Sequence, residues 1–197
     1  MAEMRARPTD PMVLARTLHA KAKAHFGSSD LDRSRATAEE ALSLVAGAPS
    51  SAEARIRIRT TLLRIANTQG RHADAASIGT RNLEERRQLL GADAPALAVD
   101  WNNLAASQLT LDRFADAEKG FREAARLLAL DPKAPESRQA WIKNGLGSAL
   151  WGLGRVDEAR RELETSRARL AALEARPGDV SLARQSLLTL DAPPPRV

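Results

Sequence analysis

The 197-residue chain contains no cysteine. Disulfides, thiolate nucleophiles and zinc–thiolate sites are therefore excluded from this sequence. No apolar run approaches the roughly 20 residues that a membrane-spanning helix needs. In the N-terminal stretch MAEMRARPTDPMVLARTLHAKAK, Arg16 interrupts the apolar residues before they can form the core of a signal peptide. We therefore expect a soluble cytoplasmic protein.

Aromatic residues are scarce, at 3% of the chain, and tyrosine is absent. Runs of β-branched residues, which are typical of strands, are missing as well. The core must therefore be built mainly from alanine and leucine, which favours helices packed closely through small side chains. With 43% hydrophobic and 28% charged residues, the composition is that of a globular, all-α protein and not of a disordered one.

Acidic residues do not fully balance the basic ones. There are 30 Lys and Arg residues against 25 Asp and Glu residues, which gives a formal net charge of +5. A coding bias toward arginine, with opposite charges interspersed on solvated helix faces, explains such an excess. Attraction to an acidic partner is the alternative explanation.

Three segments resemble one another at a spacing of 42 residues. They begin with GRHADAASIGT at Gly70, DRFADAEKGF at Asp112 and GRVDEARREL at Gly154. A constant period over three copies indicates a repeat protein. SDLDRSRATAEEALSL, from Ser29, is a degenerate fourth copy at an offset of 41 residues. The positions that coincide are Ala75, Ala117 and Ala159, and upstream of them Leu62, Leu104 and Leu146.

Each repeat is predicted to consist of two helices joined by a tight turn. Gly70 and Gly154 permit the positive φ of a helix C-cap at this turn, and Asp112 tolerates it at some cost. SSAE, from Ser50 to Glu53, has the spacing of a capping box before another helix.

This pattern resembles the tetratricopeptide repeat, whose usual period is about 34 residues. The longer period and the stretch LLGADAPALAVDWNNLA, from Leu89 to Ala105, are most similar to the kinesin-light-chain type. That type has Leu-Gly, a loop with His-Pro, and a helix with Leu-Asn-Asn-Leu-Ala; here Ala94 replaces the loop histidine and Trp101 the leading leucine. The resemblance covers residues 12 to 175 and implies a right-handed α-solenoid of about four helix-turn-helix repeats.

The end of the chain is predicted to close this array. In PGDVSLARQSLLTL, Asp179 can cap a helix with Val180, Ala183 and Leu187 on one face, which would cover the last apolar face. The predicted division is an N-terminal arm at 1–11, a degenerate first repeat at 12–48, repeats at 50–91, 94–132 and 135–175, a capping helix at 178–190 and a loose tail at 191–197.

No set of residues predicts catalysis. His19 and His25 are six residues apart, so they lie on different faces of a helix, and no His/carboxylate pair at i, i+4 accompanies them. Gly145 and Gly147 follow no strand and precede no Gly-Lys-Ser/Thr, so they indicate close helix packing and not a phosphate loop. We expect no enzymatic activity, no cofactor and no metal site.

In tetratricopeptide proteins the first helix of each repeat lines a concave groove that binds peptides. The resemblance therefore implies candidate partner-binding positions on these helices. The candidates are Arg16, Lys23, Arg57, Thr60, Arg64, Asn67, Asn102, Trp141, Asn144, Ser148 and Trp151.

The spacing of the last four candidates supports a common surface, because residues 141, 144, 148 and 151 fall on one face of a helix. Asn102 and Asn144 occupy the same place in successive repeats, where amides can bond the backbone of an extended peptide. The alternatives are that the asparagines cap or crosslink helices, that Trp141 and Trp151 pack against a neighbouring helix, and that the arginines only face solvent.

The predicted function is a non-enzymatic protein–protein interaction module. The basic candidates favour acidic side chains of the partner, and Trp141 and Trp151 can hold an apolar anchor. By analogy with related repeats, the module would be a scaffold or regulatory arm in signalling. Two alternatives are a basic solenoid that binds nucleic acid, which the acidic residues and the few stacking aromatics disfavour, and a structural oligomerisation domain.

Overall fold

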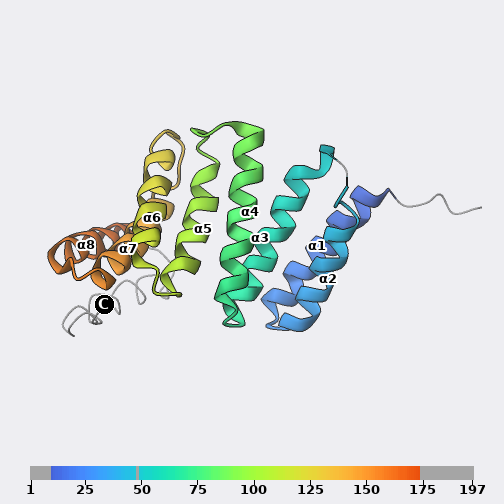
Figure 1. The fold of residues 1–197 in the computed structure, drawn as a ribbon, viewed down its shortest axis with the longest axis horizontal. Coiled ribbons are helices and arrows are strands. Elements are labelled where there is room, and N and C mark those ends of the chain that lie inside the picture. Colours follow the sequence, from blue (N-terminus) through green and yellow to red (C-terminus); the bar gives the residue numbers. More distant parts are fainter. Residues whose placement is uncertain (1–9, 48, 174–197) are drawn as a thin grey trace, which may run out of the picture. The chain divides into compact units, whose positions relative to one another are not determined.

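The computed structural model of the chain describes residues 10–47 and 49–173. This part folds into eight α-helices and one short 3-10 helix, and it contains no strand, so the all-α prediction is confirmed (Figure 1). The elements are α1 (Pro11–Gly27), α2 (Leu31–Ser43), η1 (Pro49–Ser51), α3 (Ala52–Thr68), α4 (His72–Leu90), α5 (Leu97–Leu109), α6 (Phe114–Leu128), α7 (Glu136–Gly152) and α8 (Val156–Ala172).

The chain divides into two compact units, Met1–Ile78 and Gly79–Val197, with the boundary inside α4. The predicted capping helix at 178–190, the predicted tail at 191–197 and most of the predicted N-terminal arm lie outside the described residues. The repeat bounds that we derive from the sequence period remain a prediction. None of the described helices is long and apolar enough to cross a membrane.

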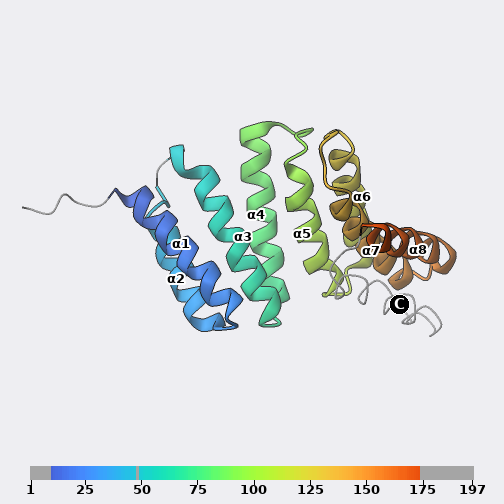
Figure 2. The same cartoon turned by 180° about the vertical axis from the view of Figure 1, so that it is seen from behind.

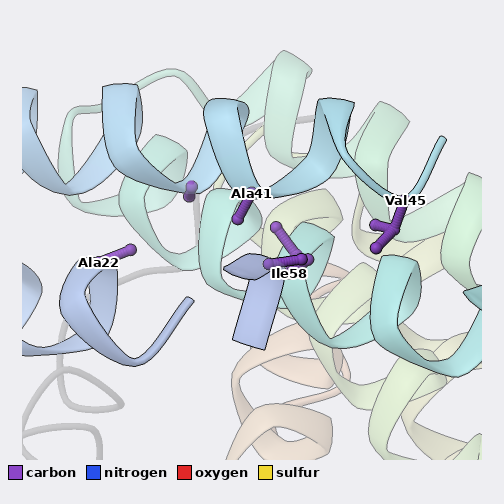
Figure 3. Packing of buried hydrophobic residues seen from close by; sticks show 6 residues of the cluster. Ala22, Ala41, Val45 and Ile58 are labelled. Atoms are coloured by element: carbon purple, nitrogen blue, oxygen red, sulfur yellow. The ribbon is translucent and has the colours of Figure 1, made fainter. Parts of the chain in front are cut away.

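In the first unit, α1, α2 and α3 pack against one another. Their shared core is built from small residues, and the branched side chain of Ile58 lies among them (Figure 3). Alanines at the contact let the helix backbones approach closely, as the alanine-rich composition predicts. The buried members of this cluster are Ala15, Ala22, Ala38, Ala41, Val45 and Ile58.

Short polar side chains fix where these helices begin. The Asp10 carboxylate accepts a hydrogen bond from the Met12 amide at 2.8 Å and so caps α1. α3 begins one residue later than the capping-box spacing predicts, after Ser51 and not Ser50. The Ser51 hydroxyl makes no capping bond and donates instead to the Val45 carbonyl at 2.7 Å, which ties the start of α3 to the end of the preceding repeat.

The turns inside the repeats share one backbone conformation. Gly70 (φ 74°), Asp112 (φ 56°) and Gly154 (φ 75°) all have positive φ, as predicted from their place in the repeat. Ser29, at the same place in the degenerate first copy, also has positive φ, 61°. The first copy therefore keeps the turn geometry although its sequence has diverged.

In the second unit, α5 packs on α6, α6 on α7, and α7 on α8 (Figure 2). Glycines allow this packing, as predicted for Gly145 and Gly147. A Cβ added at Gly145 would lie 2.3 Å from the Phe121 ring, and one at Gly147 would lie 2.6 Å from Leu163. Gly152 leaves room in the same way for the Phe114 ring, at 2.4 Å. Phenylalanines of α6 thus fill notches on α7.

One buried ion pair joins α4 and α5 in this unit. Asp100 is only 2% exposed, and its carboxylate lies 3.3 Å from Nε of Arg86. Asp100 occupies the repeat position that holds Ile58 in α3 and Ile142 in α7, both buried. The third repeat therefore has a charge where its neighbours have an apolar side chain.

Candidate partner-binding surfaces

The candidate residues fall into two groups, one in each unit. Six belong to α1 and α3 in the first unit, and we call the side of these helices that carries them the basic face. Five belong to α5 and α7 in the second unit. The first group is Arg16, Lys23, Arg57, Thr60, Arg64 and Asn67; the second is Asn102, Trp141, Asn144, Ser148 and Trp151.

The basic face contains a cavity of about 270 Å³ between α1 and α3. Its lining combines buried apolar side chains with exposed polar and charged ones, so it has an apolar floor and a charged rim. The two candidates among its lining residues are Arg16 and Arg57. The complete lining is Met12, Ala15, Arg16, His19, Ser50, Glu53, Ala54, Arg57 and Ile58.

Charge is distributed unevenly between the helices that carry the two groups. α1 has three basic residues (Arg16, Lys21 and Lys23) and no acidic one, and α3 has four (Arg55, Arg57, Arg59 and Arg64) against a single Glu53. By contrast, α5 and α7 together have two acidic and two basic residues, which are Asp100, Glu136, Arg138 and Lys143. Among the helices that carry the candidates, the excess of basic residues is therefore confined to α1 and α3.

The cations of the basic face differ in their contacts. Nε of Arg57 lies 3.1 Å from Glu53 in an exposed i, i+4 pair. The guanidinium carbon of Arg64 lies 4.6 Å from the centre of the Phe26 ring, close enough for a cation–π contact. Arg16 and Lys23 are exposed and make no ion pair with another described residue. They carry the charge that a partner can neutralise.

His19 lies at the edge of the cavity, with its Nε2 2.9 Å from the Thr61 hydroxyl. Burial lowers the pKa of His19 below the ordinary 6.5, and the neighbouring charges of Lys23 and Arg57 lower it further. The neutral imidazole is therefore favoured in the folded state. It adds no positive charge to the basic face near neutral pH.

Two other candidates of this group bond within the protein. The Thr60 hydroxyl donates to the Ile56 carbonyl at 2.8 Å, so it is turned toward its own helix. The Asn67 side-chain oxygen lies 3.2 Å from Nδ1 of His72, across the turn between α3 and α4. This contact ties the two helices of the repeat together.

The second group lies mainly on one face of α7, as its spacing predicts. Trp141, Ser148 and Trp151 are half-buried, and Asn144 is only 8% exposed. The Ser148 hydroxyl donates to the Asn144 carbonyl at 3.1 Å. On α5, Asn102 is half-buried.

The Trp151 indole N–H is enclosed and has no acceptor within the described residues. A buried donor without an acceptor costs about 1–3 kcal/mol. A ligand carbonyl that accepted this hydrogen bond would remove that cost, but the ring must turn before the N–H can reach a ligand. In its present rotamer Trp151 offers a partner only its apolar surface.

Sequence reasoning missed part of the cavity. Met12, Ser50, Glu53 and Ala54 line it, although none of them falls on a position that the resemblance carries over. Glu53 had a signal in the sequence, because it precedes Arg57 by four residues and such pairs meet on a helix. Ser50 had only a capping signal, which does not predict that it lines a cavity, because it belongs to the connection before α3.

The described residues form no cluster of metal-binding side chains. No cluster of three or more His, Asp or Glu residues with that geometry occurs in residues 10–47 and 49–173. The described part of the chain thus brings together charged and apolar surfaces for contact.

No protein-family model matches the sequence, and no curated protein matches it. Solved structures do match the fold. One is BtubC (BKLC) from P. vanneervenii, with 22% identity, a TM-score of 0.74, and coverage of 91% of this chain and 72% of that one. Another contains nearly identical TPR-like repeats of a kinesin light chain type from Podosopora anserina, with 18% identity, a TM-score of 0.71, and coverage of 92% and 87%.

The chain has the tetratricopeptide-type solenoid fold. A substituted form of the Podosopora anserina repeats matches as well, with 17% identity, a TM-score of 0.73, and coverage of 93% of this chain and 87% of that one. Both the tetratricopeptide resemblance and its kinesin-light-chain variety are therefore confirmed at the level of fold. At these identities, the matches carry no information about the partner.

Proposed function

We propose that this protein is a non-enzymatic protein–protein interaction module that binds an acidic segment of a partner on the basic face. The observation that carries the proposal is the cavity between α1 and α3, which has an apolar floor and a rim with Arg16 and Arg57. The fold supports it, because stacked helix pairs present extended surfaces that bind other proteins.

Electrostatics favour an acidic partner at this face. Arg16 and Lys23 make no ion pair with a described residue, and the pair between Arg57 and Glu53 is exposed on both sides. Exposed pairs contribute only about 0–1 kcal/mol. A carboxylate of the partner can therefore take the place of Glu53 beside Arg57 at little cost, while it gains the attraction of the neighbouring cations.

The cavity floor adds an apolar contact. Ala15 and Ile58 are buried beneath it, and Met12 and Ala54 are half-buried at its sides. An apolar side chain of the partner that entered this space would lose contact with water, at about 25 cal/mol per Å² of area buried. We infer that the bound segment places an apolar residue in the cavity and acidic residues beside it.

The α7 surface supplies a second contact in this proposal. Trp141 and Trp151 are half-buried and present apolar surface, and the amide of Asn102 is also half-buried. Tryptophans are frequent among the residues that dominate binding at interfaces. We propose that they hold a second apolar residue of the partner, and that the protein acts as a scaffold or regulatory arm in signalling, by analogy with repeats of the kinesin light chain type.

The test compares two double variants of equal charge change in affinity capture from a lysate. Arg57→Glu/Arg64→Glu reverses charge on the basic face. Arg33→Glu/Arg71→Glu makes the same change at exposed arginines, each paired with a nearby aspartate away from the cavity. We expect partners retained by wild type to fall by at least about tenfold with the first variant and by less than about twofold with the second.

Capture of the same proteins in equal amounts by wild type and Arg57→Glu/Arg64→Glu would exclude the basic face as the binding site. Nucleic acid is tested in parallel with a labelled single-stranded oligonucleotide. An affinity that falls steeply with salt, together with no captured protein, would contradict the protein-binding proposal.

A further inference from the structure

The outer face of α1 is apolar although no described element covers it. Val13 is 51% exposed and Leu14 is 37% exposed, and Thr17, Ala20 and Ala24 are exposed too. Val13, Thr17, Ala20 and Ala24 are spaced by four, three and four residues, so they share one side of the helix. A helix face that stays in water at the end of a repeat array is normally polar, and this face of α1 is apolar.

The repeat period identifies the equivalent surface on the first helices of the other repeats. Thr17 and Ala24 occupy the positions of Ile58 and Ile65 in α3, which are buried, and α2 packs on that helix. In the fourth repeat the same positions are Ile142 and Ala149 of α7, again buried, where α6 packs. The outer face of α1 is thus the counterpart of a surface that accepts a helix in other repeats.

Two further positions indicate the shape of that helix. Ala20 and Gly27 correspond to Gly145 and Gly152, whose notches are filled by Phe121 and Phe114 of α6. Phe114 and Phe121 are seven residues apart, as are the two notches. On α1 nothing lies within 4 Å of a Cβ built at Gly27, so the corresponding space is open.

Basic residues border this face on both sides. Lys21 lies along one edge, and Arg16 and Lys23 lie along the other. All three are exposed, none makes an ion pair with a described residue, and α1 itself contains no acidic side chain. A helix that packs here therefore needs acidic residues beside its apolar ridge to neutralise these charges.

A second copy of the chain fits less well. Two α1 helices would bring six cations together with no acid from either helix. The last described helix, α8, has Val156 and Leu163 at the positions of Phe114 and Phe121, but Leu163 is only 1% exposed and is not available to another chain.

We propose that the outer face of α1 binds an amphipathic helix of a partner protein, one that carries two bulky apolar residues seven positions apart and acidic residues on its flanks. This surface adjoins the basic face at Arg16 and Lys23 but does not include its cavity, and the proposal does not depend on the proposed function. It assigns a second interaction site to the first unit.

The probe is a fluorescein-labelled helix with the α6 sequence, FADAEKGFREAARLL, held by a hydrocarbon staple away from its phenylalanines. Gly120→Glu and Arg122→Glu in this peptide place acidic residues on both flanks of the ridge. Binding is followed by fluorescence anisotropy at 0.15 M salt, where charges more than about 8 Å apart are largely screened. A peptide with Phe114→Ala and Phe121→Ala is the matched control.

We expect saturable binding of the probe by wild-type protein, weakened at least about tenfold by the alanine control peptide and by Ala20→Gln/Ala24→Gln in the protein. Both alanines are exposed, so this variant should melt at the wild-type temperature by circular dichroism. Arg57→Glu/Arg64→Glu should change the affinity by less than about threefold, which separates this site from the basic face.

Absence of probe binding, or equal binding by wild type and Ala20→Gln/Ala24→Gln, would overturn the proposal. Sedimentation of the wild type at several concentrations completes the test. Self-association that Ala20→Gln/Ala24→Gln abolishes would show that a second copy, and not a partner helix, covers this face, and would contradict the proposal.

Discussion

At the scale of single residues, the buried charge in the core is the feature that the sequence predicts least well. Asp100 stands where the repeat period places isoleucine in α3 and α7, yet it is 2% exposed beside Arg86. The period predicts that the position is buried. It cannot predict the partner, because Arg86 reaches Asp100 from a different helix.

Removing one member of this pair should be far more damaging than removing both. Asp100→Ala should lower the free energy of unfolding by about 3–5 kcal/mol, because it leaves the Arg86 charge buried without its carboxylate. The double change Arg86→Leu/Asp100→Ile should bring stability back to within about 1–2 kcal/mol of wild type. Urea denaturation measures both, and equal losses for the single and double variants would show that the ion pair is not the cause.

His19 should make stability depend on pH. The folded state lowers the pKa of His19, chiefly by burial and then through Lys23 and Arg57, so the unfolded chain binds the proton more tightly. The contribution of His19 is therefore fully present above about pH 6.5 and is lost as the pH falls through the folded-state pKa. His19→Gln keeps a polar group near Thr61 and should flatten this dependence in denaturation curves between pH 8 and 5. An unchanged pH profile would assign the effect to other groups.

At the scale of helices, the period and the turn residues predict much of the structure. The left-handed turns at Gly70, Asp112 and Gly154 are where the alignment places them. The start of α3 differs from the capping-box prediction because Ser51 bonds to Val45 of the previous repeat. Rules based on neighbouring residues in the sequence do not include such contacts. For the same reason, the contact between Asn67 and His72 and the burial of Asn144 could not be predicted.

The glycine notches of α7 give a direct test of helix packing. Gly145→Ala should destabilise the protein by about 1–3 kcal/mol, because its Cβ would overlap the buried Phe121 ring and this outweighs the better helix propensity of alanine. Gly27→Ala is the matched control, since nothing lies within 4 Å of its Cβ, and it should not destabilise. Thermal unfolding compares the two, and similar melting temperatures would contradict the packing role of Gly145.

At the scale of the whole molecule, composition provides a natural reporter. The chain has no tyrosine, and its three tryptophans, Trp101, Trp141 and Trp151, all belong to the second unit. Binding of a partner to the α7 surface should therefore shift the tryptophan emission. A partner that binds fully and leaves the emission unchanged would remove Trp141 and Trp151 from the site.

The repeat architecture was predictable from the sequence because it rests on periodicity, which one chain displays in several copies. The basic face was predictable only in part. The resemblance to tetratricopeptide repeats predicts its basic residues, which are Arg16, Lys23, Arg57 and Arg64. The cavity, however, depends on how α1 and α3 pack and on the connection at Ser50. Tertiary contacts of this kind have no periodic signal.

The central claim is that a partner segment occupies the cavity of the basic face, and site-specific photocrosslinking tests it most directly. Benzoylphenylalanine is placed at Ser50, which lines the cavity and is exposed, and separately at Ala36, which is exposed on α2 and does not line it. We predict that the captured partner crosslinks to the Ser50 site, that Arg57→Glu/Arg64→Glu abolishes this product, and that the Ala36 site gives none. Crosslinking from Ala36 without crosslinking from Ser50 would contradict the claim.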